Sequence, residues 1–269
     1  MIIGTKEFQT EHKGYIMGIL NVTPDSFSDG GNYNQLDAAF YQAEKMIREG
    51  ADIIDIGGES TRPNYTMISD EEEIDRVVPV IEGLKKRFDT VLSLDTYKSN
   101  VAKAGIDAGI DLINDIWGLK WDGTMADVIA EGGVAACLMH NRKNTDYKNY
   151  IEDVMADLAE TMAMAQKAGI EKDKIMLDPG IGFAKNLEQN RLLMKHLDKL
   201  QVFDVPVLLG TSRKSMIGLT LDLPVDQREE GTMATTVMGY LAGCRFFRVH
   251  NVEANKRALQ MTEAICNQE

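Results

Sequence analysis

The chain has 269 residues, of which 44% are hydrophobic and 26% are charged, and its formal net charge at pH 7 is −13. A balance this acidic argues against duplex nucleic acid and against an anionic membrane as partners, because both require a basic face on the protein. The three cysteines form no CxxC motif and cannot all pair within the chain, which indicates a reducing compartment.

Short apolar or β-branched runs, each bounded by Gly, Pro, Asn or Asp, predict eight β-strands along the chain. Most of the runs are continuously hydrophobic rather than alternating, as expected for parallel strands that are covered on both faces. In chain order, the predicted strands are 15–20, 52–56, 91–94, 111–114, 134–139, 174–178, 206–210 and 246–249.

Segments of helical periodicity lie between these runs, and the clearest of them is 151–165. Ser69 followed by Glu72 predicts a capping box at a helix start, and Asn186 predicts a cap for a later helix. Pro79 stands inside the helical pattern that follows Ser69. We therefore expect that helix to kink or to split.

Strand and helix alternate eight times, and a right-handed series of this length closes into a (β/α)8 TIM barrel. The length suits such a barrel as a single domain over residues 1–269. An open doubly wound sheet is the alternative. The connections 21–35 and 57–68 are too long for simple connectors, which predicts binding loops or lids after the first and second strands.

The N-terminal sequence MIIGTKEFQT lacks the apolar core of a signal peptide. The longest uncharged stretch, 231–244, is too short and too rich in Thr and Gly to cross a bilayer. We therefore expect a cytoplasmic protein.

Polar side chains follow nearly every predicted strand. The active sites of barrels are assembled from these C-terminal strand ends, so we expect at least half of the polar ends to line one pocket. The polar strand ends are Asn21, Glu59, Asp95, Asn114 with Asp115, His140, Asp178, Ser212 and His250.

Asp95 and Asp178 each follow directly on an apolar run, so each carboxylate is expected to be partly desolvated at the barrel mouth. A buried carboxylate needs hydrogen-bond donors to remain ionised. A heterocycle with an amidine-like N–H edge would supply two parallel donors. The alternative is that each Asp is a turn residue bonded to nearby backbone.

Four cationic or imidazole side chains stand at or just after strand ends: Arg62, Lys214, Arg248 and His250. Singly, each could be a surface charge beside an acid, but together in so acidic a chain they predict an anion site. Asn251 could cap the last helix, whose first backbone N–H groups would add to that site. No HExxH, cysteine cluster or GxSxG occurs, so zinc catalysis and acyl-enzyme chemistry have little support.

Seven ordered sequence blocks resemble the dihydropteroate synthase family, and they span nearly the whole chain. The blocks are GILNVTPDSFSDGG (18–31), GGESTRP (57–63), SLDT (93–96), INDI (113–116), LDPGIGFAK (177–185), GTSRKS (210–215) and RVHNV (248–252). Residues 139–147 share only a Met-His start with many relatives, and no ligand role is assigned to 140–147.

The resemblance implies that p-aminobenzoate is joined to 7,8-dihydropterin-6-ylmethyl diphosphate, with release of pyrophosphate and formation of 7,8-dihydropteroate for folate synthesis. It implies a pterin site of Asp95, Asn114, Met139, Asp178 and Lys214. It implies a diphosphate site of Asn21, Arg62, Arg248 and His250, with Asn21 as ligand of a Mg²⁺ cofactor. It implies a p-aminobenzoate pocket of Phe27, Thr61, Pro63, Phe183, Lys214 and Ser215, at which sulfonamides would compete.

The residues expected to carry catalysis are Asn21, Arg62, Asp95, Asp178, Lys214 and Arg248. Asp29 is expected to help order Mg²⁺ or the closed first loop. The resemblance also suggests a homodimer through helices of the later half of the chain. Two alternatives are a barrel that transfers a methyl group from methyltetrahydrofolate to a corrinoid and a paralogue that binds pterin without turnover.

Overall fold

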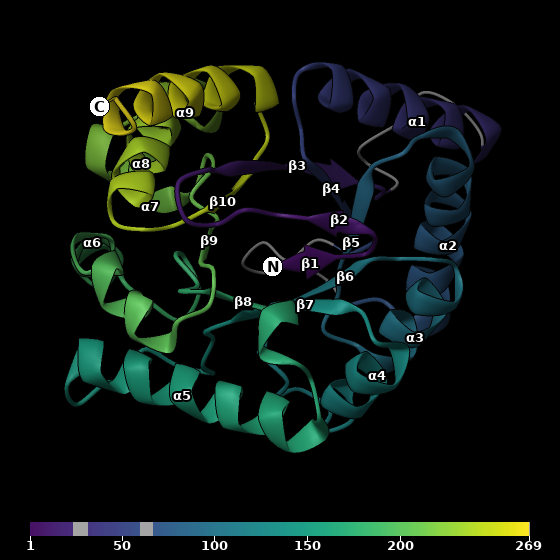
Figure 1. Ribbon diagram of the computed structural model, residues 1–269, viewed down its shortest axis with the longest axis horizontal. Coiled ribbons are helices and arrows are strands. Elements are labelled where there is room, and N and C mark those ends of the chain that lie inside the picture. The colour runs from purple at the N-terminus through teal and green to yellow at the C-terminus, as the bar shows by residue number, and fades with distance from the viewer. Residues whose placement is uncertain (24–31, 60–66, 269) are drawn as a thin grey trace.

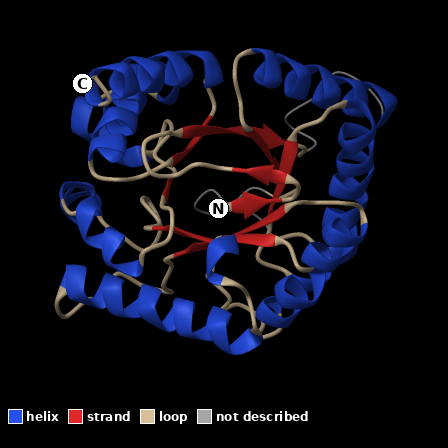
Figure 2. Ribbon diagram, in the orientation of Figure 1, coloured by secondary structure: helices blue, strands red, loops and turns tan. Residues whose placement is uncertain are grey.

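Eight parallel strands form a ring at the centre of the computed structural model, which describes residues 1–23, 32–59 and 67–268 (Figures 1 and 2). In chain order these strands are β3 (Tyr15–Asn21), β4 (Ile53–Gly57), β5 (Val91–Asp95), β6 (Leu112–Asp115), β7 (Ala135–Met139), β8 (Ile175–Asp178), β9 (Leu208–Leu209) and β10 (Phe246–Val249). Their order in the sheet is β8-β7-β6-β5-β4-β3-β10-β9. A parallel bridge between Leu177 and Val207 brings β8 back to the start of β9. The predicted TIM barrel is confirmed.

Helices surround the strands on the outside, as Figure 2 shows. They are α1 (Asn32–Arg48), α2 (Asp70–Arg87), α3 (Ser99–Asp107), α4 (Met125–Gly132), α5 (Tyr150–Ala168), α6 (Leu187–Lys195), α7 (Ser215–Leu221), α8 (Glu229–Leu241) and α9 (Val252–Cys266). Short 3₁₀ turns are η2 (Lys172–Lys174), η3 (Leu197–Phe203) and η4 (Val225–Gln227). No helix in the described part of the chain is both long and apolar enough to cross a membrane.

The predicted N-caps are confirmed, but the capping box predicted at Ser69 and Glu72 is only half formed, since the Glu72 carboxylate accepts from Arg76. The side chain of Ser69 accepts from Glu72 N, Asn186 forms a complete capping box, and Asn251 caps α9 by accepting from Ala254 N. Pro79 does not split its helix, because α2 is one continuous helix. The alternative, a kink at Pro79, stays a prediction.

Two of the predicted strands agree with the structure to different degrees. The strand predicted at 246–249 is β10 itself, whereas the one predicted at 206–210 shrinks to Leu208–Leu209. Pro206 has no amide hydrogen for a ladder bond, although its carbonyl accepts from Leu177 N at 3.0 Å.

The N-terminal half of the barrel interior is an apolar core, closed from below by a hairpin that the sequence pattern did not predict. The hairpin pairs β1 (Ile2–Ile3) with β2 (Lys6–Glu7), and it sits over the centre of the ring in Figure 1. Ile3 is fully buried, and the ring of Phe8 lies 4.8 Å from that of Tyr15. Because apolar side chains fill the N-terminal end, the inward-facing polar residues lie at the C-terminal end. The core members are Ile3, Phe8, Tyr15, Met17, Ile53, Val91, Leu112, Ala135, Cys137, Met176, Leu208 and Phe246.

Candidate active site

The register of the barrel brings the predicted polar strand ends side by side. Asn21 pairs with Gly57, Gly57 with Asp95, and Asp95 with Asn114. Alternate residues of a strand point to the same face, so these positions all lie on the inner wall at the C-terminal rim.

Arg248 on β10 lies between two buried carboxylates. Its Nε donates to Asp55 Oδ2 at 2.5 Å, and a terminal nitrogen donates to Asp95 Oδ2 at 2.7 Å. Ser93 Oγ donates to Asp55 Oδ1 at 2.5 Å, and Asn114 Nδ2 donates to Asp55 Oδ2 at 3.2 Å. Burial alone would lower the pKa of Arg248, but the two carboxylates reverse this and raise it, so the guanidinium stays charged.

Asp55 is a site residue that the sequence pattern did not predict. It lies inside β4 rather than at its end, so a search of strand ends passes over it. The available signal was a single Asp within the apolar run 53–56. A carboxylate in a strand covered on both faces requires a buried cation, and here the cation is Arg248.

One carboxylate oxygen of Asp95 has no hydrogen-bond donor among the described residues. Its Oδ2 bonds to Arg248, whereas its buried Oδ1 has no hydrogen-bond partner among the described residues. Burial raises the pKa of Asp95 to about 7, with Arg248 opposing the shift. A ligand N–H directed at Oδ1 would complete this carboxylate.

Asp178, Lys214 and Arg248 converge around Gly210. A β-carbon added to this glycine would lie 3.6 Å from Asp178 Oδ2, 3.8 Å from Lys214 Nζ and 3.9 Å from Arg248 Cβ. Asp178 Oδ1 accepts from Gly180 N at 2.7 Å, so one oxygen is used by the turn and the other faces Lys214 and Arg248. Burial raises the pKa of Asp178, and the nearby Lys214 ammonium opposes the rise.

Gly57 has a similar place on the other side of the mouth. A β-carbon there would lie 3.5 Å from Asn21 Oδ1 and 3.9 Å from Asp95 Oδ2. Glycines at these two inward positions leave the space between the polar groups free of protein side chain.

Lys214 connects this wall to the turn after β8. Its ammonium donates to Ile181 O and lies 4.8 Å from the centre of the Phe183 ring. Burial lowers the pKa of Lys214 to about 8, with Asp178 opposing the change. Ser215 begins α7 directly after Lys214, and its side chain is exposed.

Two further predicted residues also lie at this end of the barrel. Met139 is buried in a small cluster with Tyr97 and Ile116, against which Phe183 packs. His250 is oriented by Ser212, whose Oγ lies 2.9 Å from His250 Nδ1.

Three of the polar strand ends serve the framework and not the pocket. Asp115 accepts from the backbone N–H groups of residues 117 and 119, and Glu59 pairs with Lys98 at 2.8 Å. His140 is buried between Asp157 and Lys185, at 2.9 Å from each. These three side chains therefore anchor turns and loops and do not line the pocket.

Five predicted residues lie outside the described part of the chain: Phe27, Asp29, Thr61, Arg62 and Pro63.

Asn21 is the candidate ligand for a divalent cation. Within residues 1–23, 32–59 and 67–268, no group of three or more His, Cys, Asp or Glu side chains could hold a metal ion. Mg²⁺ often takes only one or two protein oxygens and completes its shell with substrate phosphates and water. The amide oxygen of Asn21, a hard donor beside Gly57, fits such a sparse set.

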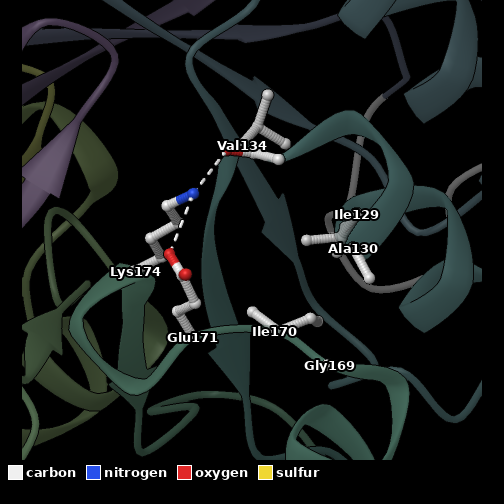
Figure 3. A pocket seen from close by; sticks show the side chains of 8 residues that line it. Ile129, Ala130, Val134, Gly169, Ile170, Glu171 and Lys174 are labelled. Atoms are coloured by element: carbon white, nitrogen blue, oxygen red, sulfur yellow. Dashed lines mark hydrogen bonds and ion pairs between the residues drawn. The ribbon is translucent and has the colours of Figure 1, made fainter.

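A small cavity of about 140 Å³ lies at the far end of β8, between α4, α5 and η2 (Figure 3). Lys174 on its wall donates to Gly133 O at 3.1 Å and pairs with Glu171 at 3.2 Å. It precedes the strand that Asp178 ends, so this cavity is not part of the candidate site.

Comparison with known proteins gives consistent matches over nearly the whole chain. A family described as pterin binding enzyme matches residues 17–250. A dihydropteroate synthase from Clostridium beijerinckii is 56% identical over 266 residues, which cover 98% of this chain and 99% of the relative.

Two solved structures extend the comparison to the fold. The dihydropteroate synthase of Clostridium difficile in the presence of pteroic acid has a TM-score of 0.95 at 47% identity, covering 97% of this chain and 100% of that one. That of Yersinia pestis with a sulfonamide drug complex has a TM-score of 0.93 at 41% identity, covering 100% of this chain and 99% of that one.

Proposed function

Because this chain belongs to the dihydropteroate synthase family of pterin-binding enzymes, we propose that the residues at its barrel mouth bind and align the two substrates of that family's reaction. The chain is a transferase that condenses p-aminobenzoate with 7,8-dihydropterin-6-ylmethyl diphosphate. The products are 7,8-dihydropteroate, an intermediate of folate synthesis, and pyrophosphate.

The pterin ring is assigned to Asp95, Asn114, Met139, Asp178 and Lys214. The observation that carries this assignment is the acceptor Oδ1 of Asp95, buried and without a donor among the described residues. Asp178 Oδ2 beside Gly210 offers a second carboxylate oxygen near the same space. A heterocycle bearing several ring and exocyclic N–H groups would satisfy both acids, and Lys214 would donate to a ring acceptor.

The diphosphate is assigned to Asn21, Arg62, Arg248 and His250. Arg248 uses two of its five N–H donors on Asp55 and Asp95, so it can present others to a phosphate oxygen. Asn21 would hold Mg²⁺, which when bound to the diphosphate would neutralise charge on the leaving group.

The p-aminobenzoate is assigned to Phe27, Thr61, Pro63, Phe183, Lys214 and Ser215. Phe183 lies against the Lys214 ammonium, so an aromatic ring placed there would be close to the pterin side of the mouth. Ser215 at the start of α7 would meet the carboxylate.

The reaction requires alignment more than covalent help from the protein. A C–N bond forms from the amine to the methylene carbon as the C–O bond breaks, pyrophosphate leaves with the electron pair, and the amine nitrogen loses one proton. Asp95 and Asp178 would stabilise the cationic character that the pterin gains as the C–O bond breaks. Asn21, Arg62 and Arg248 would hold the leaving group in line.

A homodimer is proposed for the assembly. Apolar side chains are exposed on α7, α8 and α9, which cluster on one side of the barrel in Figure 1. They include Leu219, Met238, Leu241, Met261 and Ile265. Exposed apolar side chains gathered on neighbouring helices are typical of a subunit interface. A monomeric mass in sedimentation analysis would contradict the dimer.

One domain over residues 1–269 and a cytoplasmic location are proposed as well. The free thiols of Cys137, Cys244 and Cys266 support a reducing compartment.

The test of the proposed site is pyrophosphate release by the purified chain. Release should require both p-aminobenzoate and the pterin diphosphate, and it should fall strongly when Mg²⁺ is removed by a chelator. Sulfonamides should raise the apparent KM for p-aminobenzoate without lowering kcat. Purely uncompetitive inhibition would contradict the assigned p-aminobenzoate pocket.

A further inference from the structure

A buried lysine follows the strand that ends in Asp178. Lys185 is 9% exposed, and its Nζ lies 2.9 Å from Gly180 O, 2.9 Å from Phe183 O and 2.9 Å from His140 Nδ1. An ammonium has three N–H donors, and three acceptors surround this one. Burial lowers the pKa of Lys185 to about 7, with the Asp178 carboxylate opposing the change. In its charged form Lys185 is fully engaged by protein and has no donor left for a substrate.

His140 joins this ammonium to the outer layer of the barrel. Its Nε2 lies 2.9 Å from Asp157 Oδ2 on α5, and Asp157 also accepts from Arg142 Nε at 2.5 Å. Because Nδ1 faces an ammonium and Nε2 faces a carboxylate, the network assigns the neutral tautomer with hydrogen on Nε2. Burial lowers the pKa of His140 to about 4, with Asp157 opposing, so the ring stays a neutral acceptor at physiological pH.

The turn at 180–183, whose carbonyls bind Lys185, also forms hydrogen bonds with Asp178 and Lys214 of the candidate site. Gly180 N donates to Asp178 Oδ1 at 2.7 Å, and Ile181 O accepts from the Lys214 ammonium. Lys185 binds the carbonyls of residues 180 and 183, which lie on either side of Ile181.

The backbone of this turn depends on outside support. Gly180 and Gly182 have φ of +71° and +86°, and a β-carbon on Gly180 would lie only 2.0 Å from His140 O. The two glycines contribute no side chain to the turn, so its backbone is held by hydrogen bonds from neighbouring residues. The Lys185 ammonium supplies two of these bonds, and Asn190 Oδ1 accepts another from Gly182 N at 2.6 Å.

We propose that Lys185 is a positioning residue that, with His140 as its acceptor, fixes the turn at 180–183 and thereby sets the relative placement of the Asp178 carboxylate and the Lys214 ammonium. This inference rests on the proposed function, since both of those groups are assigned to the substrates. Without the ammonium, the acceptors at Gly180, Phe183 and His140 lose their shared donor, and the turn relaxes to find water or other partners.

The test replaces Lys185 by Met, which preserves length and volume but removes all three donors. The matched control is Lys174→Met, because Lys174 also donates to a backbone carbonyl but at the opposite end of β8 (Figure 3). We expect Lys185→Met to weaken equilibrium binding of pteroic acid about tenfold and to raise KM for the pterin diphosphate by a similar factor. Lys174→Met should stay within twofold of wild type in both.

The KM-against-kcat comparison separates positioning from simple loss of folded protein. A smaller folded fraction lowers the apparent kcat and leaves KM and the pteroic acid affinity unchanged. That pattern in Lys185→Met, or wild-type values of both constants, would overturn the inference.

A second variant covers the case in which Lys185→Met does not fold. His140→Phe keeps a ring in the same buried place and removes both ring nitrogens, so the acceptor for Lys185 and the donor to Asp157 are lost together. Pteroic acid binding should weaken about threefold. Unchanged binding would refute the proposed role of His140. Failure of the wild-type chain to release pyrophosphate would instead overturn the proposed function, so the two failures are distinguishable.

Discussion

The two ends of the barrel interior are built from the same strands but from opposite kinds of side chain. At the N-terminal end β4 and β10 contribute Ile53 and Phe246 to an apolar core. Two residues further along, the same strands contribute Asp55 and Arg248, an ion pair at 2.5 Å. Because alternate side chains of a strand share a face, a step of two residues along the strand leads from the apolar core to the polar candidate site.

This difference divides stability from activity between the two ends. Large apolar side chains at the N-terminal end of the barrel interior, the lower end, contribute to folding, and removing one leaves a cavity. Carboxylates and cations at the C-terminal end, the upper end, are costly to bury. They are therefore suited to bind a ligand that completes their hydrogen bonds. Substitutions at the two ends should therefore change different quantities.

The largest expected effect is that of Asp178→Asn at the upper end. An amide replaces one of the two acceptor oxygens by an NH2 donor, which would face the ligand donors without a partner, so kcat/KM should fall about 10⁴-fold, or ~5.5 kcal/mol. Steady-state pyrophosphate release measures this, with the exposed Asp173→Asn at the other end of β8 as control. Turnover within tenfold of wild type would remove Asp178 from the site.

Next in size is Phe246→Ala at the lower end. The Phe246 ring is fully buried and lies 5.3 Å from that of Tyr15, so its loss should lower the free energy of unfolding by about 3–5 kcal/mol. Urea unfolding gives this value. KM for both substrates should remain within twofold in the folded variant, and a tenfold change in KM would break the proposed division between the ends.

Lys214→Ala should have a smaller effect on activity than Asp178→Asn. The ammonium contacts Ile181 O and Phe183, so its removal should weaken pterin and p-aminobenzoate together, lowering kcat/KM about 10²-fold, or ~2.7 kcal/mol. KM determined separately for each substrate checks this, with the exposed Lys199→Ala as control. An increase in only one of the two KM values would contradict the shared role.

An effect of another kind, on stability and not on catalysis, is the pH dependence of the unliganded protein that comes from Asp95. The pKa of Asp95 is about 7 in the folded chain, above the ordinary value of 3.8, because burial favours the protonated acid. Between about pH 4 and pH 7 the folded state therefore binds a proton that the unfolded state has released, and stability falls as pH rises through this window. Asp95→Asn should flatten that part of the profile, as measured by urea unfolding at several pH values. Parallel profiles for the two proteins would show that Asp95 does not titrate there.

Much of the fold follows from local pattern, because buried parallel strands are marked by continuous apolar runs with turn residues after them. The order of the strands and the polar residues at their ends were therefore predictable from the sequence. The hairpin of β1 and β2 was not, since each strand has two residues and the turn depends on Gly4 at a φ of +58°.

The candidate site was predictable where a side chain contacts the open mouth and not where it acts through another residue. Asp55 and Lys185 both stand within recognisable segments, but their importance appears only when Arg248 and His140 are found beside them. Pairings of this kind join residues far apart in the chain, and no periodicity of a single segment reports them. Conversely, Asp115 and Glu59 have the right type and position for a pocket, but their oxygens are used by nearby turns and by Lys98.

The place of β10 has a consequence for how the chain is made. The last strand to leave the ribosome lies between β9 and the first barrel strand, β3, so the first and last strands of the barrel are neighbours in the ring (Figure 1). Arg248 on that strand is also the shared cation of Asp55 and Asp95. A nascent chain can neither close its ring nor neutralise these two acids until translation is nearly complete. A premature stop before residue 246 would therefore yield an open sheet with unpaired edges, prone to aggregation, rather than a weakened enzyme.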